Sequence, residues 1–173
     1  MDKFQEIRPY QDAEVKAVLA SLLRDSDMLD SIARFYAPKL SRFLPFLARR
    51  LAKYTLAKQL RGVDSIRAIQ HVIAKYLDKM IEETTTSLTH SGLENLNPDR
   101  SYVFICNHRD IAMDPAFVNY MLYHAGFETL QIAIGDNLLK KPFVSDLMRL
   151  NKSFIVKRSV KGRELLASLR LLS

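Results

Sequence analysis

Apolar residues in the first half of the chain recur every three or four positions, which is the spacing of amphipathic helices. Stripes of this kind predict helices that begin at Asp12 (as the N-cap), near Met28 and at Asp64. Proline residues interrupt the pattern between these helices, as expected where a helix has to end. We therefore expect residues 1–84 to form an N-terminal helical region.

Beyond residue 84 the pattern changes to short apolar runs separated by helical stretches. The apolar runs predict strands at Ser87–His90, Tyr102–Cys106, Glu128–Ile134 and Ser153–Val156. The other stretches predict helices over Pro115–Tyr123, Leu138–Leu150 (broken at Pro142) and Leu165–Leu172. Strands that alternate with helices favour parallel pairing with right-handed crossovers. The predicted fold of residues 85–173 is therefore α/β, a mainly parallel sheet with flanking helices, and residues 1–84 precede it as a helical arm.

Polar residues follow three of these strands, at the end where α/β proteins bind their ligands. In chain order they are His108 with Arg109, the Gly135-Asp136-Asn137 turn, and Lys157 with Arg158. A histidine becomes a general base when a carboxylate fixes one ring nitrogen and leaves the other free. Asp114 is close enough in sequence to orient His108 and is also placed to cap the next helix, and Asp110 is a second candidate. A capped helix behind a loop histidine would explain the same residues without any chemistry.

Charge points to an anionic partner. The chain carries a net charge of +7, and its pI is near 9.6. In residues 39–61 cations alternate with apolar side chains and no acidic residue occurs. A basic amphipathic helix of this kind suits an anionic lipid surface, whereas a core-packed helix with a solvated basic face is the alternative interpretation.

Other features limit the possible classes. No apolar run approaches the roughly 20 residues that span a bilayer, so we expect a cytoplasmic protein that is peripheral to the membrane. The single cysteine, Cys106, lies in a predicted apolar strand, where a buried and unreactive thiol is expected. The sequence has no cluster of residues at metal-ligand spacing and no glycine-rich nucleotide loop. We therefore expect no metal and no cofactor.

Two stretches resemble a known family. Residues 107–115 (NHRDIAMDP) resemble the first motif of the glycerolipid acyltransferases, in which an Asn-His pair is followed by an aspartate. Residues 134–158 (IGDNLLKKPFVSDLMRLNKSFIVKR) resemble that family's second block, with its Gly-Asp-Asn-Leu turn and a strand that ends in arginine. The resemblance begins near Leu88. The sequence departs from the family pattern in two ways. Five residues separate His108 from Asp114, where the family has four. The family's third block, which ends in Glu-Gly, is absent, so the chain looks like a fragment.

The resemblance implies an O-acyltransferase of phospholipid synthesis. Such an enzyme moves a fatty acyl group from a thioester, on acyl-CoA or acyl carrier protein, to a hydroxyl of a phosphorylated glycerol. It implies that His108 deprotonates this hydroxyl, that Asp114 stabilises the imidazolium, and that the guanidinium of Arg158 grips the acceptor phosphate. The further substrate-binding candidates are Lys157, Arg109, Asp110 and the turn of Gly135, Asp136 and Asn137.

Two other classes are open at this point. The irregular His-Asp spacing is compatible with a non-catalytic protein that binds anionic lipid on an acyltransferase-like scaffold. A nucleic-acid-binding module would use the basic segment but leaves the α/β half unexplained, so no nucleic acid is expected. The sequence leaves open the acceptor (glycerol 3-phosphate, dihydroxyacetone phosphate or lysophosphatidate), the acyl donor and its chain length, and the oligomeric state.

Overall fold

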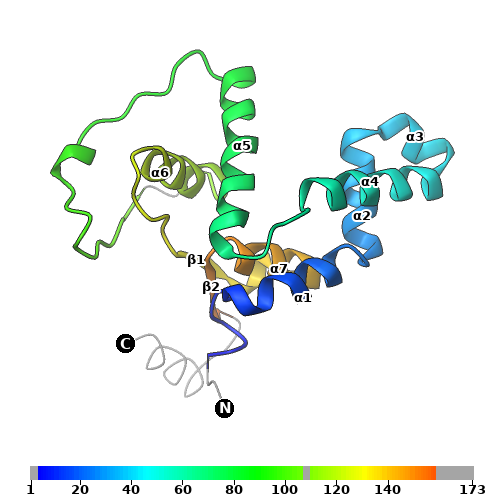
Figure 1. The fold of residues 1–173 in the computed structure, drawn as a ribbon, viewed down its shortest axis with the longest axis horizontal. Coiled ribbons are helices and arrows are strands. Elements are labelled where there is room, and N and C mark those ends of the chain that lie inside the picture. Colours follow the sequence, from blue (N-terminus) through cyan, green and yellow to red (C-terminus); the bar gives the residue numbers. More distant parts are fainter. Residues whose placement is uncertain (1–3, 107–109, 159–173) are drawn as a thin grey trace. The chain divides into compact units, whose positions relative to one another are not determined.

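The computed structural model describes residues 4–106 and 110–158 (Figure 1). Contacts between Cα atoms divide the chain into two compact units, which we describe separately. One unit combines Met1–Ile69 with Ala133–Ser173, and the other is Gln70–Ile132. The boundary that we expect near residue 84 stays a prediction.

Four helices open the first unit: α1 (Asp12–Leu22), α2 (Ser26–Tyr36), α3 (Pro38–Phe43) and α4 (Pro45–Gln59). The N-cap of α1 is Gln11, and our assignment of that role to Asp12 is wrong. Gln11 forms a capping box with Glu14, in which the Gln11 backbone N–H donates to the Glu14 carboxylate. The Asp12 carboxylate instead accepts a hydrogen bond of 2.7 Å from the backbone N–H of Ile66.

The basic segment forms α3 and α4, two helices where one was expected. Leu44 adopts a non-helical conformation between them and α4 starts at Pro45, because proline cannot donate a backbone hydrogen bond inside a helix. An ion pair joins α4 to α2, in which the Arg49 guanidinium donates through Nε and Nη2 to the two carboxylate oxygens of Asp30, each at 2.7 Å. This hydrogen bonding holds the pKa of the Asp30 carboxyl below its usual range.

The same unit contains the sheet. Strands β1 (Ile132–Gly135) and β2 (Ser153–Val156) pair in parallel, and the crossover between them contains η2 (Asp136–Leu138) and α7 (Pro142–Leu150). The β2 prediction is confirmed residue for residue, whereas β1 is shorter than the predicted strand. The N-terminal segment lies against β2, since the backbone N–H of Ile155 donates to the Ile7 carbonyl at 2.8 Å.

The second unit contains most of α5 (Ile66–Thr84), the short η1 (Leu93–Asn95) and α6 (Met113–His124). Side-chain pairs connect α5 with α6. His71 Nδ1 lies 2.7 Å from the Tyr123 hydroxyl, and His124 Nε2 lies 3.0 Å from an oxygen of Asp78. Gly126 ends α6 with φ of +82°, a left-handed conformation that glycine adopts without strain.

Two predicted strands are absent from this unit. Ser87–His90 and Tyr102–Cys106 have no strand pairing, and Val103 and Ile105 are 90% and 94% exposed. A strand is stable only when a neighbour pairs with its backbone groups, and the described part of the chain gives these segments none. Cys106 is exposed, so the expectation of a buried thiol is also wrong. The predicted helix at Leu165–Leu172 lies outside the described residues.

The described chain is thus rich in helices and carries a small parallel sheet, which is consistent with an α/β fold. None of its described helices is long and apolar enough to cross a membrane.

Candidate functional site

The ends of the two paired strands bring together the polar residues that follow them. β1 leads into Gly135, Asp136 and Asn137, and β2 leads into Lys157 and Arg158. The backbone N–H of Arg158 donates to Asp136 Oδ1 at 3.0 Å. Because parallel strands end at the same edge of a sheet, residues 22 positions apart in sequence meet here.

Gly135 is the point of closest approach in this strand-end cluster, by which we mean Gly135, Asp136, Asn137 and Arg158. Gly135 is buried, and a Cβ atom placed on it would lie 3.1 Å from both Cδ and Nε of Arg158. The same Cβ would clash with Oδ1 of Asn137. The absence of a side chain therefore lets the Arg158 and Asn137 side chains lie directly against the backbone at the end of β1.

Lys157 belongs to a different part of the surface. Its Nζ lies 3.6 Å from Oε2 of Glu6, in the N-terminal segment. Neighbouring residues of an extended segment point to opposite sides, so the two cations that follow β2 separate. Of this pair, the structure places Arg158 beside the turn and directs Lys157 to Glu6.

A buried arginine on the helix between β1 and β2 was not foreseen from the sequence. Arg149 on α7 is 9% exposed, and its guanidinium stacks on the ring of Tyr10 at 4.0 Å. It donates to the backbone carbonyls of Arg8 (2.8 Å) and Gln5 (2.5 Å) and, through Nη1, to the Tyr10 hydroxyl at 3.2 Å. These bonds fasten the N-terminal segment to the helix that connects β1 to β2.

The Tyr10 hydroxyl completes this network. It donates to Asp146 Oδ1 at 2.6 Å. Burial of the ring and this hydrogen bond raise the pKa of Tyr10 to about 12. The sequence signal that could have indicated the network is the spacing of Asp146 and Arg149, which places both side chains on one face of a helix.

The carboxylates predicted to orient His108 lie at the start of α6, in the second unit. Asp110 Oδ1 accepts hydrogen bonds of 2.8 Å from the backbone N–H groups of Ala112 and Met113. Asp114 Oδ2 accepts from the backbone N–H of Asp110 at 3.1 Å. The capping role that we expected of Asp114 therefore falls to Asp110, because Asp114 is already inside the helix, whose N-cap position is Ala112. His108 and Arg109 lie outside the described residues, so their pairing with either carboxylate stays a prediction.

A metal site finds no support in the described ranges, where no group of three or more histidine, cysteine, aspartate or glutamate side chains could hold an ion. The strand-end cluster contains the guanidinium of Arg158 and a polar turn. Guanidinium groups and backbone amides of this kind suit a phosphate or carboxylate ligand.

Comparison with known proteins places the motifs in a family. Residues 87–171 match the family model described as Acyltransferase. A glycerol-3-phosphate acyltransferase from Xanthomonas axonopodis pv. citri (strain 306) is 32% identical over 108 residues, which cover 54% of this chain but only 12% of the relative. No solved structure matches the chain. Residues 87–171 are therefore similar in sequence to the acyltransferase family.

Proposed function

We propose that the protein transfers a fatty acyl group from an acyl thioester to a hydroxyl of a phosphorylated glycerol, as a step of phospholipid synthesis. The observation that carries this proposal is the strand-end cluster, in which Arg158 lies against the Gly135-Asp136-Asn137 turn. An anionic acceptor fits a guanidinium that projects beside a polar turn at the end of a parallel sheet. Glycerol 3-phosphate is the acceptor that the name of the Xanthomonas relative contains.

The proposed chemistry divides among few residues. His108 takes the proton of the acceptor hydroxyl as its oxygen attacks the thioester carbonyl, and Asp114 or Asp110 stabilises the imidazolium that results. The new C–O ester bond forms and the C–S bond breaks. The proton on His108 then passes to the departing thiolate, so the products are an acyl ester and a free thiol. Arg158 holds the acceptor phosphate, with Lys157 and Arg109 as additional cations.

We also propose that the protein works at an anionic membrane surface, on the cytoplasmic side. The support is the surface of α3 and α4, where Phe43, Leu47 and Leu51 are 76%, 50% and 51% exposed. These large apolar side chains lie among the cations of residues 39–61. Apolar side chains that insert among lipid headgroups beside basic residues are how interfacial helices bind.

The test is acyl transfer to glycerol 3-phosphate from radiolabelled acyl-CoA or acyl carrier protein, measured with the purified, folded protein in detergent. His108→Ala is expected to lower turnover by a factor of roughly 100 or more, since general-base catalysis contributes about that much. Thermal unfolding of the variant serves as the control for folding. Unchanged turnover in His108→Ala would show that His108 is not the general base. A protein that binds lipid but transfers no acyl group to any phosphorylated glycerol would be the non-catalytic alternative.

A further inference from the structure

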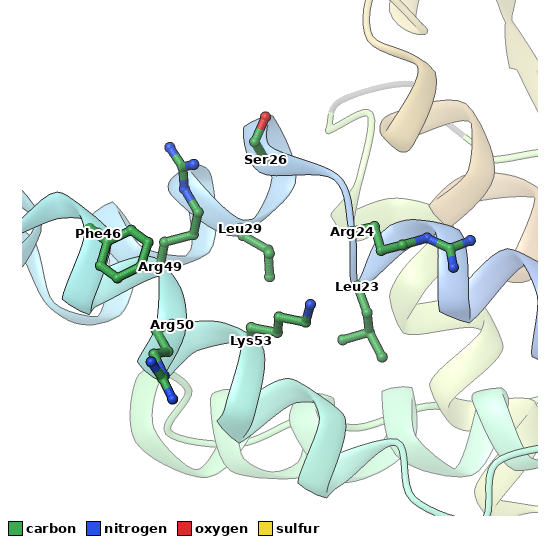
Figure 2. Close-up of a pocket in the computed structure, with 8 residues that line it drawn as sticks. All are labelled: Leu23, Arg24, Ser26, Leu29, Phe46, Arg49, Arg50 and Lys53. Carbon is green, nitrogen blue, oxygen red and sulfur yellow. The ribbon is translucent and has the colours of Figure 1, made fainter.

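A pocket between α2 and α4 has a chemistry that differs from that of the strand-end cluster. It has a volume of about 360 Å³, and its apolar wall is formed by Leu23, Leu29 and Phe46 (Figure 2). Leu29 is buried at the base, whereas Phe46 is 75% exposed at the edge. We call this feature the α2–α4 pocket.

Cationic side chains surround the apolar wall. Lys53 reaches toward Leu23 and Leu29, while Arg50 lies one helical turn away at the rim and points outward (Figure 2). Arg49 also lines the pocket, but its guanidinium is neutralised by Asp30. Within the described residues the structure shows no ion pair for Arg50 or Lys53, so their positive charge is available to a partner.

Helix α4 has a second exposed surface, which is apolar. Leu47, Leu51 and Tyr54 follow one another at helical spacing and are 50%, 51% and 69% exposed. Helical geometry places this apolar stripe beside the face that carries Phe46, Arg50 and Lys53, because the two sets differ by about one residue, or roughly 100° around the axis. The helix therefore offers adjacent apolar and cationic faces.

We propose that the α2–α4 pocket binds one anionic phospholipid of the bilayer, an inference that rests on the proposed function at a membrane surface. The glycerol backbone and first acyl carbons contact Leu23, Leu29 and Phe46, the phosphate lies beside Lys53, and Arg50 at the rim is the second cation. A free phosphate ion would gain nothing from the apolar wall, and an apolar partner helix would leave the cations unpaired. The stripe of Leu47, Leu51 and Tyr54 enters the bilayer beside the bound lipid.

Sedimentation with vesicles tests the proposal. The vesicles contain two parts phosphatidylcholine to one part phosphatidylglycerol, with pure phosphatidylcholine as the reference. Arg50→Gln combined with Lys53→Gln is expected to weaken binding roughly 25-fold, at about fivefold for each cation near an anionic surface. The matched control is Lys58→Gln combined with Arg61→Gln, which removes the same charge from the same segment outside the pocket and is expected to weaken binding much less.

Equal losses in the two double variants would show diffuse attraction and overturn the pocket, while leaving the membrane proposal intact. Equal binding of the wild-type protein to both kinds of vesicle, or displacement by millimolar inorganic phosphate at constant ionic strength, would overturn it as well. Acyl transfer in detergent is measured in parallel. A double variant that loses vesicle binding but keeps transfer supports the pocket, whereas absent transfer in the wild type speaks against the proposed function alone.

A fluorescent reporter gives a second readout that does not depend on charge. The chain contains no tryptophan, so Phe46→Trp introduces a single one at the edge of the pocket. Its emission is expected to shift to shorter wavelength on vesicles and to be quenched by a lipid that carries a spin label on its headgroup. Tyr54→Trp, on the apolar stripe, is expected to be quenched more strongly by a label on the acyl chain. Emission of the Phe46→Trp variant that does not change on vesicles would overturn the proposal.

Discussion

The protein has two cationic surfaces that differ in what surrounds the positive charge. At the strand-end cluster, Arg158 lies against a glycine and a polar turn, and its backbone is held by Asp136. At the α2–α4 pocket, Lys53 and Arg50 border the side chains of two leucines and a phenylalanine. The strand-end cluster suits a small hydrated anion, because its polar groups replace the water that the anion loses. The α2–α4 pocket suits an amphiphile, because its apolar wall covers the carbon atoms of the ligand. Positive charge alone therefore does not define the ligand.

The two surfaces also differ in how they are supported. The helix that connects β1 to β2 carries the buried Arg149, which forms with the half-buried Tyr10 a hydrogen-bonded network that includes backbone carbonyls. The pocket is supported by the Arg49–Asp30 ion pair, whose side chains are 42% and 32% exposed. A network of several hydrogen bonds around a buried arginine fixes geometry more tightly than a single solvent-screened ion pair does. We expect the cluster to tolerate substitution less well than the pocket.

Among single substitutions that compare the two surfaces, Arg158→Ala is expected to have the largest effect, and it separates them by kinetics. Arg158→Ala should raise the KM for glycerol 3-phosphate by a factor of about 10 or more, since a hydrogen bond to a charged group contributes about 1.5–3 kcal/mol. Turnover should fall less, because phosphate binding is much the same in the ground state and the transition state. Arg158→Lys should recover part of the loss. Arg50→Gln is the control, and equal KM changes in both variants would contradict the separation.

A smaller effect is expected from Gly135→Ala. The added Cβ meets the Arg158 side chain at 3.1 Å and clashes with Asn137, so both side chains have to move while the charge stays the same. We expect a rise in KM of severalfold, measured in the same assay, with turnover nearly unchanged. Ala133→Gly is the control, since Ala133 is exposed on β1 and the substitution adds no atom near the cluster. Gly92→Ala would be a poor control, because the φ of +91° at Gly92 would strain any residue with a side chain. An unchanged KM in Gly135→Ala would show that the position of Arg158 does not matter for the acceptor.

Two segments with the same apolar pattern show what sequence can predict of this fold. Ser153–Val156 and Tyr102–Cys106 are both short and apolar, and only the first is a strand in the structure. β2 has a partner in β1 and further covering by the segment around Ile7, whereas no described strand pairs with Tyr102–Cys106. The apolar pattern reports a tendency to be extended, but strand formation depends on pairing that the local sequence does not contain. Helices close their hydrogen bonds locally, so most of their positions were predicted well.

The same distinction applies to the candidate site. The meeting of Arg158 with the Gly135-Asp136-Asn137 turn was foreseeable, since parallel strands end at one edge. The pairing of Tyr10 with Asp146 joins residues 136 positions apart and follows no local rule. The capping by Asp110 was missed because α6 begins at Met113 and not at the predicted Pro115, which puts Asp114 inside the helix.

Tyr10→Phe tests the hydrogen-bonded network of Tyr10, Asp146 and Arg149. The variant loses the hydrogen bond to Asp146, and we expect the free energy of unfolding at neutral pH to fall by about 1 kcal/mol in urea titrations. The pH dependence is more specific. The folded state raises the Tyr10 pKa from 10.0 to about 12, so this contribution is fully present below pH 10 and is lost as the pH rises toward 12. The gap in stability between wild type and variant should therefore narrow from pH 9 to pH 11.

Tyr36→Phe is the matched control for this titration. Tyr36 is 65% exposed, and removal of its hydroxyl should leave stability nearly unchanged at both pH values. A gap between wild type and Tyr10→Phe that stays constant with pH would show that the Tyr10 hydroxyl is not held by the network. A widening gap would contradict the direction of the pKa shift itself.

The smallest effect is expected from Asp30→Asn at the pocket, and it has opposite signs in two measurements. Asp30→Asn removes the carboxylate that neutralises Arg49, so the melting temperature should fall slightly, because an exposed ion pair contributes little to stability. The released charge adds a cation to the pocket wall, and binding to anionic vesicles should therefore become stronger, with no change on pure phosphatidylcholine. No comparable variant of the network around Arg149 is expected to gain binding, since its bonds hold the N-terminal segment against α7. If Asp30→Asn weakens both stability and vesicle binding, the ion pair is needed for the shape of the pocket, and the proposed difference between the two surfaces fails.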